Sequence, residues 1–247
     1  MPNRKKDDLF EFEIHTMTRK EMQEAMHRRL RKIYNEFLNA FEFIKKYPKS
    51  ATFFGSARAS ENDFYYQKAR HLSERISKEL GYTIFSGGGG GIMEAGNRGA
   101  FEAGGKTVGL NIRLPHQQQR NKYTLKTIEI SYFFVRKVAL SFAAEAYIFF
   151  PGGYGTLDEF FEIVTLIQTG KIPKVPLILF GNEYWGKLNS FLKDTVYSSY
   201  KAIDEKDLEL FTITEDEDLI LKKIATSPER TPLPSSEDAN LPLAIKQ

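Results

Sequence analysis

A buried strand, a glycine turn and a helix follow one another between Ala146 and Gly170, and this stretch constrains the fold more than any other. Residues 146–150 form a short continuous apolar run, as a strand buried on both faces requires, and Pro151 ends it because proline cannot donate to a central ladder. Thr156 stands where a helix N-cap is expected, and apolar residues then recur at helical spacing. A doubly covered strand followed directly by a helix predicts a layered α/β fold.

The turn in this stretch reads PGGYG, with glycine at positions 152, 153 and 155. The first N–H groups of a helix have no intrahelical partner and carry the positive end of the dipole, so an anion, and above all a phosphate, is the expected guest. A second interpretation is structural, because Thr156 and Glu159 also form a capping-box pattern in which Glu159 only reaches back to the N-cap. Since acids repel phosphate, at least one of Asp158 and Glu159 must point towards another part of the ligand.

The chain around this stretch alternates strands and helices. Repeated βα units predict an α/β, Rossmann-like, doubly wound parallel sheet with helices on both faces. The expected strands are 51–54, 82–85, 107–112, 125–130, 146–150, 175–180 and 210–213. The expected helices are 63–80, 92–103, 132–144, 156–170, one containing Trp185, and 215–225.

The remaining segments flank this domain. We expect a flexible arm at 1–17, an amphipathic helix at 18–47, the Rossmann-like nucleotide-binding catalytic domain at 48–226, and a disordered tail at 227–247 that is rich in Pro, Ser and charge. The helix opens with a capping box, and its apolar stripe comprises Met22, Met26, Leu30, Ile33, Phe37, Ala40 and Ile44. A narrow stripe of this kind favours a helix that lies across the domain surface or against a second subunit, more than one on a membrane surface.

Composition excludes several classes of protein. No apolar run approaches the roughly 18 residues of a transmembrane helix, and the charged N-terminus lacks the apolar core of a secretory signal. The chain has no cysteine, so a disulfide framework or thiolate chemistry is excluded, and we expect a cytoplasmic enzyme. The net charge of +3 arises from interleaved acids and bases, so neither a nucleic-acid nor a membrane partner is expected.

Two further strand ends carry turns of small residues, at Gly55-Ser56 and at Gly87–Gly91. In a parallel sheet these turns and the PGGYG turn lie at the carboxyl edge, where together they outline one crevice, although each alone is also typical of a tight corner. A dinucleotide site is disfavoured, because the strand that follows ends in Asn111 and Arg113, without an acid for a ribose hydroxyl.

Other chemistries lack their motifs. The sequence contains neither a G-x-S-x-G elbow nor a G-x-x-x-x-G-K-[ST] loop, and its histidines are too scattered to form a zinc site. We therefore expect no metal and no cofactor. What remains is a phosphate-binding crevice with arginine, lysine and carboxylates near it.

At PGGYGTLDE the sequence resembles the Lonely Guy family of cytokinin riboside 5′-monophosphate phosphoribohydrolases, often labelled lysine decarboxylase-like. The family signature PGGxGTxxE is preceded by an R-K pair, and here Arg136-Lys137 precede Pro151–Glu159 at that spacing. The turn at Gly55-Ser56 and the glycine loop also follow the family order, and the long N-terminal helix is similar to the larger bacterial branch. The decarboxylase label gains no support from the residues, since no lysine has a recognisable cofactor-binding context.

The resemblance implies hydrolysis of the N-glycosidic bond of a nucleoside 5′-monophosphate, AMP or a cytokinin riboside 5′-monophosphate, to free base and ribose 5-phosphate. Residues 114–119 lack a glutamate that family members commonly carry, so the preferred base stays open. We expect the phosphate to bind Gly152, Gly153, Gly155 and Thr156, with Ser56, Gly88, Gly89 and Gly90 lining the crevice.

The expected catalytic residues are Glu159, which stabilises the oxocarbenium-like ribose, and Arg136, which stabilises the leaving base or the phosphate. Lys137 is a supporting contact, and Glu94 is either a further contact or only a solvated helix residue. The alternative function is a nucleotide-binding module without hydrolase activity. The family resemblance, together with the apolar stripes of the N-terminal helix and of the helix at 156–170, also predicts a homodimer or higher homo-oligomer.

Overall fold

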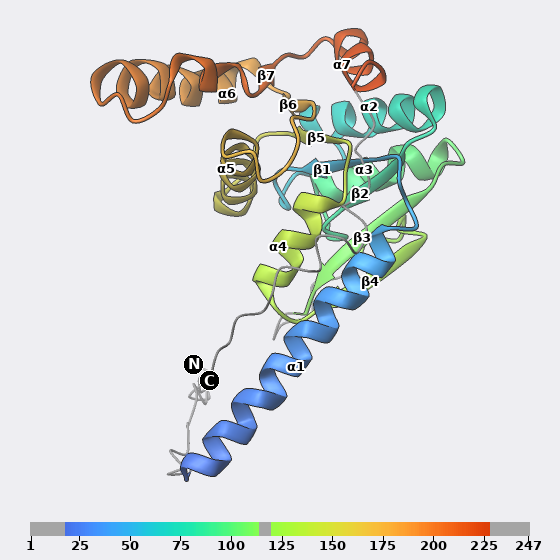
Figure 1. The fold of residues 1–247 in the computed structure, drawn as a ribbon. Coiled ribbons are helices and arrows are strands. Elements are labelled where there is room, and N and C mark those ends of the chain that lie inside the picture. Colours follow the sequence, from blue (N-terminus) through green and yellow to red (C-terminus); the bar gives the residue numbers. More distant parts are fainter. Residues whose placement is uncertain (1–17, 114–119, 228–247) are drawn as a thin grey trace, which may run out of the picture.

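The fold was analysed in a computed structural model that describes residues 18–113 and 120–227. It contains a seven-stranded sheet of parallel strands in the order β4-β3-β2-β1-β5-β6-β7 (Figure 1). The strands are β1 (Ser50–Phe54), β2 (Thr83–Ser86), β3 (Thr107–Ile112), β4 (Lys126–Ile130), β5 (Ala146–Phe149), β6 (Leu177–Leu179) and β7 (Thr212–Ile213). The predicted doubly wound parallel sheet is confirmed.

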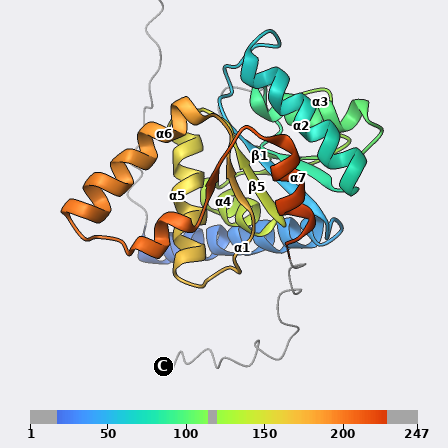
Figure 2. The same cartoon turned by 90° about the horizontal axis from the view of Figure 1, so that it is seen from above.

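Helices cover both faces of the sheet (Figure 2). One face carries α2 (Phe64–Leu80), α3 (Ile92–Glu102) and α7 (Glu217–Ala225), and the other carries α1 (Arg19–Ile44), α4 (Phe133–Phe142), α5 (Tyr154–Gln168) and α6 (Asn182–Ser190). Alternate residues of each central strand enter the two cores: Phe54 and Phe149 pack with α4 and α5, whereas Phe53 and Ile148 pack with α2 and α3. This double burial explains why these strands read as continuous apolar runs.

Helix α1 begins at the predicted capping box, in which the Glu21 backbone N–H donates to the Thr18 hydroxyl. Only its C-terminal half packs on the domain, where Ala40 and Ile44 are buried. Its N-terminal half projects beyond the sheet (Figure 1). Apolar side chains along α1 between residues 22 and 38 are 48–65% exposed: Met22, Met26, Leu30, Tyr34 and Leu38.

The C-terminal region differs from the prediction. After α6 the chain continues into a π-helical segment, Phe191–Ser199, and a 3-10 segment, Glu205–Glu209, neither of which the sequence patterns predicted. The predicted arm at 1–17, the tail from residue 228 and the loop residues 114–119 lie outside the described residues. Within the described ranges, no helix has both the length and the apolar character needed to span a membrane.

The strand order reverses between β1 and β5. From β1 the chain proceeds outwards through β2, β3 and β4 and then returns to β5 on the other side of β1. Ligands of open parallel sheets bind at such a switch point, beyond the carboxyl ends of the strands. The turns after β1 and β5 are therefore the place to look for a functional site.

Candidate functional site

Backbone hydrogen bonds join the three glycine-containing turns into one structure. Ser56 N–H donates to the Pro151 carbonyl at 3.0 Å, and Ile92 N–H donates to the Ser56 carbonyl, also at 3.0 Å. The turns at 55–56, 87–91 and 151–155, here called the glycine edge, thus lie side by side across the switch point. The predicted convergence of these turns is observed.

Helix α5 begins earlier than the sequence indicated. Its N-cap is Gly153, and the N–H groups of Thr156 and Leu157 both donate to the Gly153 carbonyl, at 3.0 and 3.1 Å. Assigning Thr156 as the N-cap was therefore wrong: Thr156 is the third helical residue, and its side chain is buried. The capping-box interpretation fails for the same reason, since Glu159 lies too deep in the helix to reach the N-cap.

The glycines of the PGGYG turn differ in what the fold demands of them. A Cβ at Gly152 would stand 2.1 Å from Oγ1 of Thr156, so the packed turn itself excludes a side chain there. A Cβ at Gly153 or Gly155 would meet nothing within 4 Å in the described structure. Glycine inside a helix lowers stability by about 1 kcal/mol relative to alanine. Packing therefore does not explain the glycine at position 155.

Arg136 extends from α4 beneath the glycine edge. Its Nε donates to the Leu110 carbonyl at 2.7 Å, and its Nη2 lies 2.1 Å from the position of a Cβ at Gly87. Burial lowers the pKa of the Arg136 guanidinium, and the charge of Glu159 opposes that shift. Arginine stays protonated at any working pH, so this residue supplies a fixed positive charge.

Glu159 is the most unusual side chain of the site. Glu159 is only 7% exposed, and its Oε2 has no hydrogen-bond partner among the described residues. Burial raises the pKa of Glu159 to about 7, although the nearby Arg136 acts to lower it. No ion pair joins the two residues in the described part of the chain, which leaves both free to contact a third molecule. Perturbed titratable groups of this kind are typical of catalytic sites.

The other predicted site residues have partners within the protein. Lys137 forms ion pairs with Asp158 at 2.9 Å and Glu162 at 2.8 Å, which connect α4 to α5. Glu94 accepts a hydrogen bond from the Tyr66 hydroxyl at 3.1 Å. The Ser56 hydroxyl accepts the N–H of Arg58 at 3.1 Å. Ser56 and the glycine loop thus line the same edge, whereas the ammonium group of Lys137 is already paired with carboxylates.

A group of buried polar residues that the sequence analysis missed holds the glycine loop in place. Asn121 Nδ2 donates to the Gly89 carbonyl at 2.9 Å, and Asn111 Nδ2 donates to the Gly88 carbonyl at 3.3 Å. The Ser86 hydroxyl donates to Asn97 at 2.5 Å. Polar residues inside otherwise apolar segments, such as Asn111 in TVGLNI, were the available signal. Among the described residues, no group of three or more potential ligands could hold a metal ion.

Comparisons of the sequence with known proteins identify its relatives. The family model described as possible lysine decarboxylase matches residues 93–224. The chain is 27% identical over 157 residues to the cytokinin riboside 5′-monophosphate phosphoribohydrolase of Rhodococcoides fascians, with 62% of this chain and 78% of that protein covered. A phosphoribohydrolase of the same description from Arabidopsis thaliana is 25% identical over 159 residues, covering 63% of this chain and 68% of that protein.

Solved structures show the same fold. A molybdenum cofactor binding protein from Rippkaea orientalis superposes with a TM-score of 0.51 at 20% identity, covering 71% of this chain and 96% of that one. The molybdenum cofactor carrier protein of Chlamydomonas reinhardtii has a TM-score of 0.51 at 21% identity, with 71% and 98% covered. Because the family model spans more than half of the chain, this protein belongs to the Lonely Guy, possible lysine decarboxylase family that its PGGxGTxxE motif indicated.

Proposed function

We propose that the protein hydrolyses the N-glycosidic bond of a nucleoside 5′-monophosphate, AMP or a cytokinin riboside 5′-monophosphate. The products are the free base and ribose 5-phosphate. One observation carries the proposal: a buried carboxylate, Glu159, has an unpartnered oxygen and stands near the fixed charge of Arg136, next to a glycine-lined helix N-terminus. The descriptions of the curated relatives support the same reaction.

The spacing along α5 suits a ribose 5-phosphate unit. An α-helix rises about 1.5 Å per residue, so the backbone of Glu159 lies roughly 9 Å along the axis from Gly153. Helical side chains tilt towards the N-terminus, which brings the carboxylate closer to the turn. With the phosphate on the N–H groups at Gly153–Gly155, Glu159 is placed for the ribose and not for the phosphate. This placement removes the conflict between the acid and the anion.

The chemistry then follows from the charges. The bond between C1′ and the base nitrogen breaks with its electron pair leaving on the base, and positive charge develops on the ribose ring. Ionised Glu159 stabilises that charge and accepts a proton from the water whose oxygen bonds to C1′. The base nitrogen takes up one proton from solvent, and Glu159 returns to solvent the proton that it accepted, so one water is consumed overall. Arg136 stabilises the negative charge of the leaving base or of the phosphate.

A substitution at Gly155 separates ligand binding from folding. Gly155→Ala is expected to raise the melting temperature slightly, because alanine is the better helix former by about 1 kcal/mol and its Cβ has open space. The same methyl group should obstruct a phosphate on the turn and weaken binding of ribose 5-phosphate about tenfold or more. Calorimetric titration and thermal melts measure the two effects.

Gly186→Ala is the matched control for this substitution. Gly186 also lies inside a helix, and a Cβ added there would meet no atom within 4 Å, so the control should gain stability without losing affinity. Unchanged affinity for ribose 5-phosphate in Gly155→Ala would place the phosphate elsewhere.

The alternative is a binding module without hydrolysis. Two proteins with this fold are described as binding or carrying the molybdenum cofactor, so the fold alone does not specify a glycosidase. The two functions differ in one observable, since only the hydrolase releases free base from a bound nucleotide. Parallel incubations with AMP and with a cytokinin riboside 5′-monophosphate test the hydrolase and compare the two bases.

We also propose that the protein forms a homodimer or larger homo-oligomer. The stripe of the α5 helix no longer supports this, because Phe160, Ile163 and Ile167 are buried against the protein's own sheet. Support comes from α1, whose exposed apolar residues recur at every fourth position from Met22 to Leu38.

Light scattering at micromolar concentration is expected to give at least twice the mass of one chain. The substitutions Met26→Glu and Leu30→Glu together should lower that mass, because each puts a charge on the stripe. The exposed pair Arg19→Glu and Lys20→Glu, on the same helix, provides the control. A monomer mass for the unaltered protein would contradict the proposal.

A further inference from the structure

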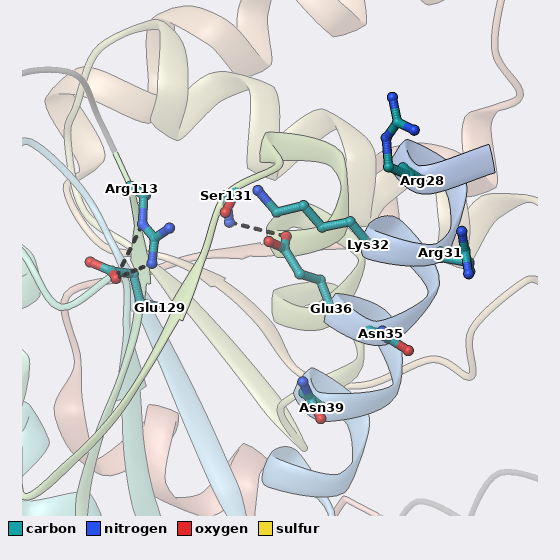
Figure 3. Close-up of a pocket in the computed structure, with 9 residues that line it drawn as sticks. All are labelled: Arg28, Arg31, Lys32, Asn35, Glu36, Asn39, Arg113, Glu129 and Ser131. Atoms are coloured by element: carbon teal, nitrogen blue, oxygen red, sulfur yellow. Dashed lines mark hydrogen bonds and ion pairs between the residues drawn. The ribbon is translucent and has the colours of Figure 1, made fainter. Parts of the chain in front are cut away.

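A hollow that is open to solvent lies between α1 and the ends of β3 and β4 (Figure 3). Its volume is about 500 Å³, and it is called the α1 cavity below. The residues that line it are Arg28, Arg31, Lys32, Asn35, Glu36, Asn39, Arg113, Glu129 and Ser131. No residue of the glycine edge is among them. The volume is within the range of small-molecule sites, but the lining is polar throughout, so the occupant must be polar as well.

Positive charge exceeds negative charge in the α1 cavity. Of its six charged residues four are cationic, and both carboxylates already have partners. Glu129 is paired with Arg113 at 2.8 Å. Glu36 accepts the backbone N–H groups of Ser131 and Tyr132, at 3.0 and 3.3 Å. Glu36 keeps its negative charge when it accepts these N–H groups, so the four cationic and two acidic residues give the lining a net charge of +2.

One cationic side chain of the lining, Lys32, lies at the N-terminus of α4. Tyr132 is the N-cap of α4, and Lys32 Nζ lies 5.6 Å from the centre of its ring. Figure 3 shows Lys32 and Glu36 extending from α1 towards Ser131. The Glu36 carboxylate already occupies the N–H groups of Ser131 and Tyr132, so it offsets the positive end of the α4 dipole, and the attraction for an anion comes from the cationic side chains. Asn35 and Asn39 contribute amide donors from α1.

We propose that the α1 cavity binds a phosphorylated small molecule with at least two negative charges, at a site separate from the glycine edge. Phosphate is favoured because guanidinium groups bind its oxygens through paired hydrogen bonds, and side-chain amides can donate to them as well. A single charge would leave part of the cationic lining uncompensated. The proposal does not depend on the reaction at the glycine edge, since none of its residues acts there.

The site is connected to the catalytic region through α4. Glu36, which lines the α1 cavity, accepts the N–H groups of Ser131 and Tyr132, and the Tyr132 carbonyl accepts the backbone N–H of Arg136 at 3.1 Å. A bound anion is in a position to alter the reaction without contacting the substrate.

Calorimetric titration with inorganic tripolyphosphate tests the proposal on the full chain. The variant Arg31→Ala/Lys32→Ala should bind about 10- to 100-fold more weakly, because each charge-assisted hydrogen bond contributes about 1.5–3 kcal/mol. The control Arg19→Ala/Lys20→Ala removes the same charge from α1 outside the cavity and should change the affinity little. All these side chains are exposed, so both variants should melt like the unaltered protein.

Citrate serves as a polyanion without phosphate and is expected to bind more weakly than tripolyphosphate. Equal affinities of the Arg31→Ala/Lys32→Ala variant and the unaltered protein would overturn the site. An equal loss of affinity in the Arg19→Ala/Lys20→Ala control would show that net charge alone attracts the anion and would also overturn the site. Citrate binding as tight as tripolyphosphate binding would overturn the assignment to phosphate.

Discussion

Replacing Glu159 by glutamine is expected to reduce the turnover of AMP by about 10² to 10³, the usual effect of removing one preorganised electrostatic group. Glutamine keeps the size of the side chain but can neither accept a proton from water nor balance a cationic ribose. Binding of ribose 5-phosphate should change little, because in the proposed complex the turn, and not Glu159, holds the phosphate. Steady-state release of adenine and a calorimetric titration measure these quantities.

The same substitution should raise the stability of the folded protein at alkaline pH. Burial raises the pKa of Glu159 from its ordinary 4.5 to about 7. As pH rises, this carboxyl therefore loses its proton at a lower pH in the unfolded chain than in the folded protein. The stability that the protonated group contributes is therefore lost as pH rises from about 4.5 through about 7, by about 3 kcal/mol in total. Glutamine does not titrate, so Glu159→Gln should melt higher than the unaltered protein at alkaline pH and not at acidic pH.

Glu162→Gln is the control for both measurements. Glu162 follows one turn later on α5 and is paired with Lys137, so its substitution should leave most of the turnover intact. Near-normal turnover in Glu159→Gln would refute the catalytic assignment.

Replacing Arg136 by methionine is expected to lower turnover by a similar factor, about 10² to 10³. Methionine retains the apolar stem but supplies no charge to the leaving base or the phosphate. It also removes the cation that lowers the pKa of Glu159 most, ahead of Lys137, so that pKa should rise further above about 7. The acid limb of the kcat/KM profile, which reports ionisation of Glu159 in the free enzyme, should move to higher pH.

Lys137→Met is the matched control, because Lys137 is the next residue and its charge is taken up by Asp158 and Glu162. It should disturb the contact between α4 and α5 more than the chemistry. An acid limb at the same pH in Arg136→Met and the unaltered protein would show that Arg136 does not act on Glu159.

The strand and helix pattern could be predicted because central parallel strands are buried on both faces. Runs such as 51–54 and 146–149 have to be apolar at nearly every position, and the helices between them have to show an apolar stripe. Because the carboxyl ends of parallel strands lie at one edge of the sheet, the predicted strand positions also implied that the glycine turns lie close together. Arg136 and Glu159 came from the family motif and not from periodicity.

Sequence patterns did not predict features that depend on contacts between distant segments. Glycine is a poor helix former, so the start of α5 was expected at Thr156, whereas the packed turn allows the helix to begin directly after Gly153. The partners of Lys137 depend on how α4 meets α5, and those of Asn121 depend on a loop far away in the sequence. The α1 cavity arises where Glu36 meets Ser131, a contact between residues 95 positions apart.

The central claim, that Glu159 makes this phosphate site a glycosidase, is tested most directly by incubating the purified protein with AMP. Chromatography of the products should show adenine and ribose 5-phosphate appearing in equal amounts, at a rate that falls steeply in Glu159→Gln. Adenosine is the negative control, because it lacks the phosphate that the PGGYG turn would hold. Retention of intact AMP by a protein that demonstrably binds it, with no adenine released, would contradict the account and leave a binding module.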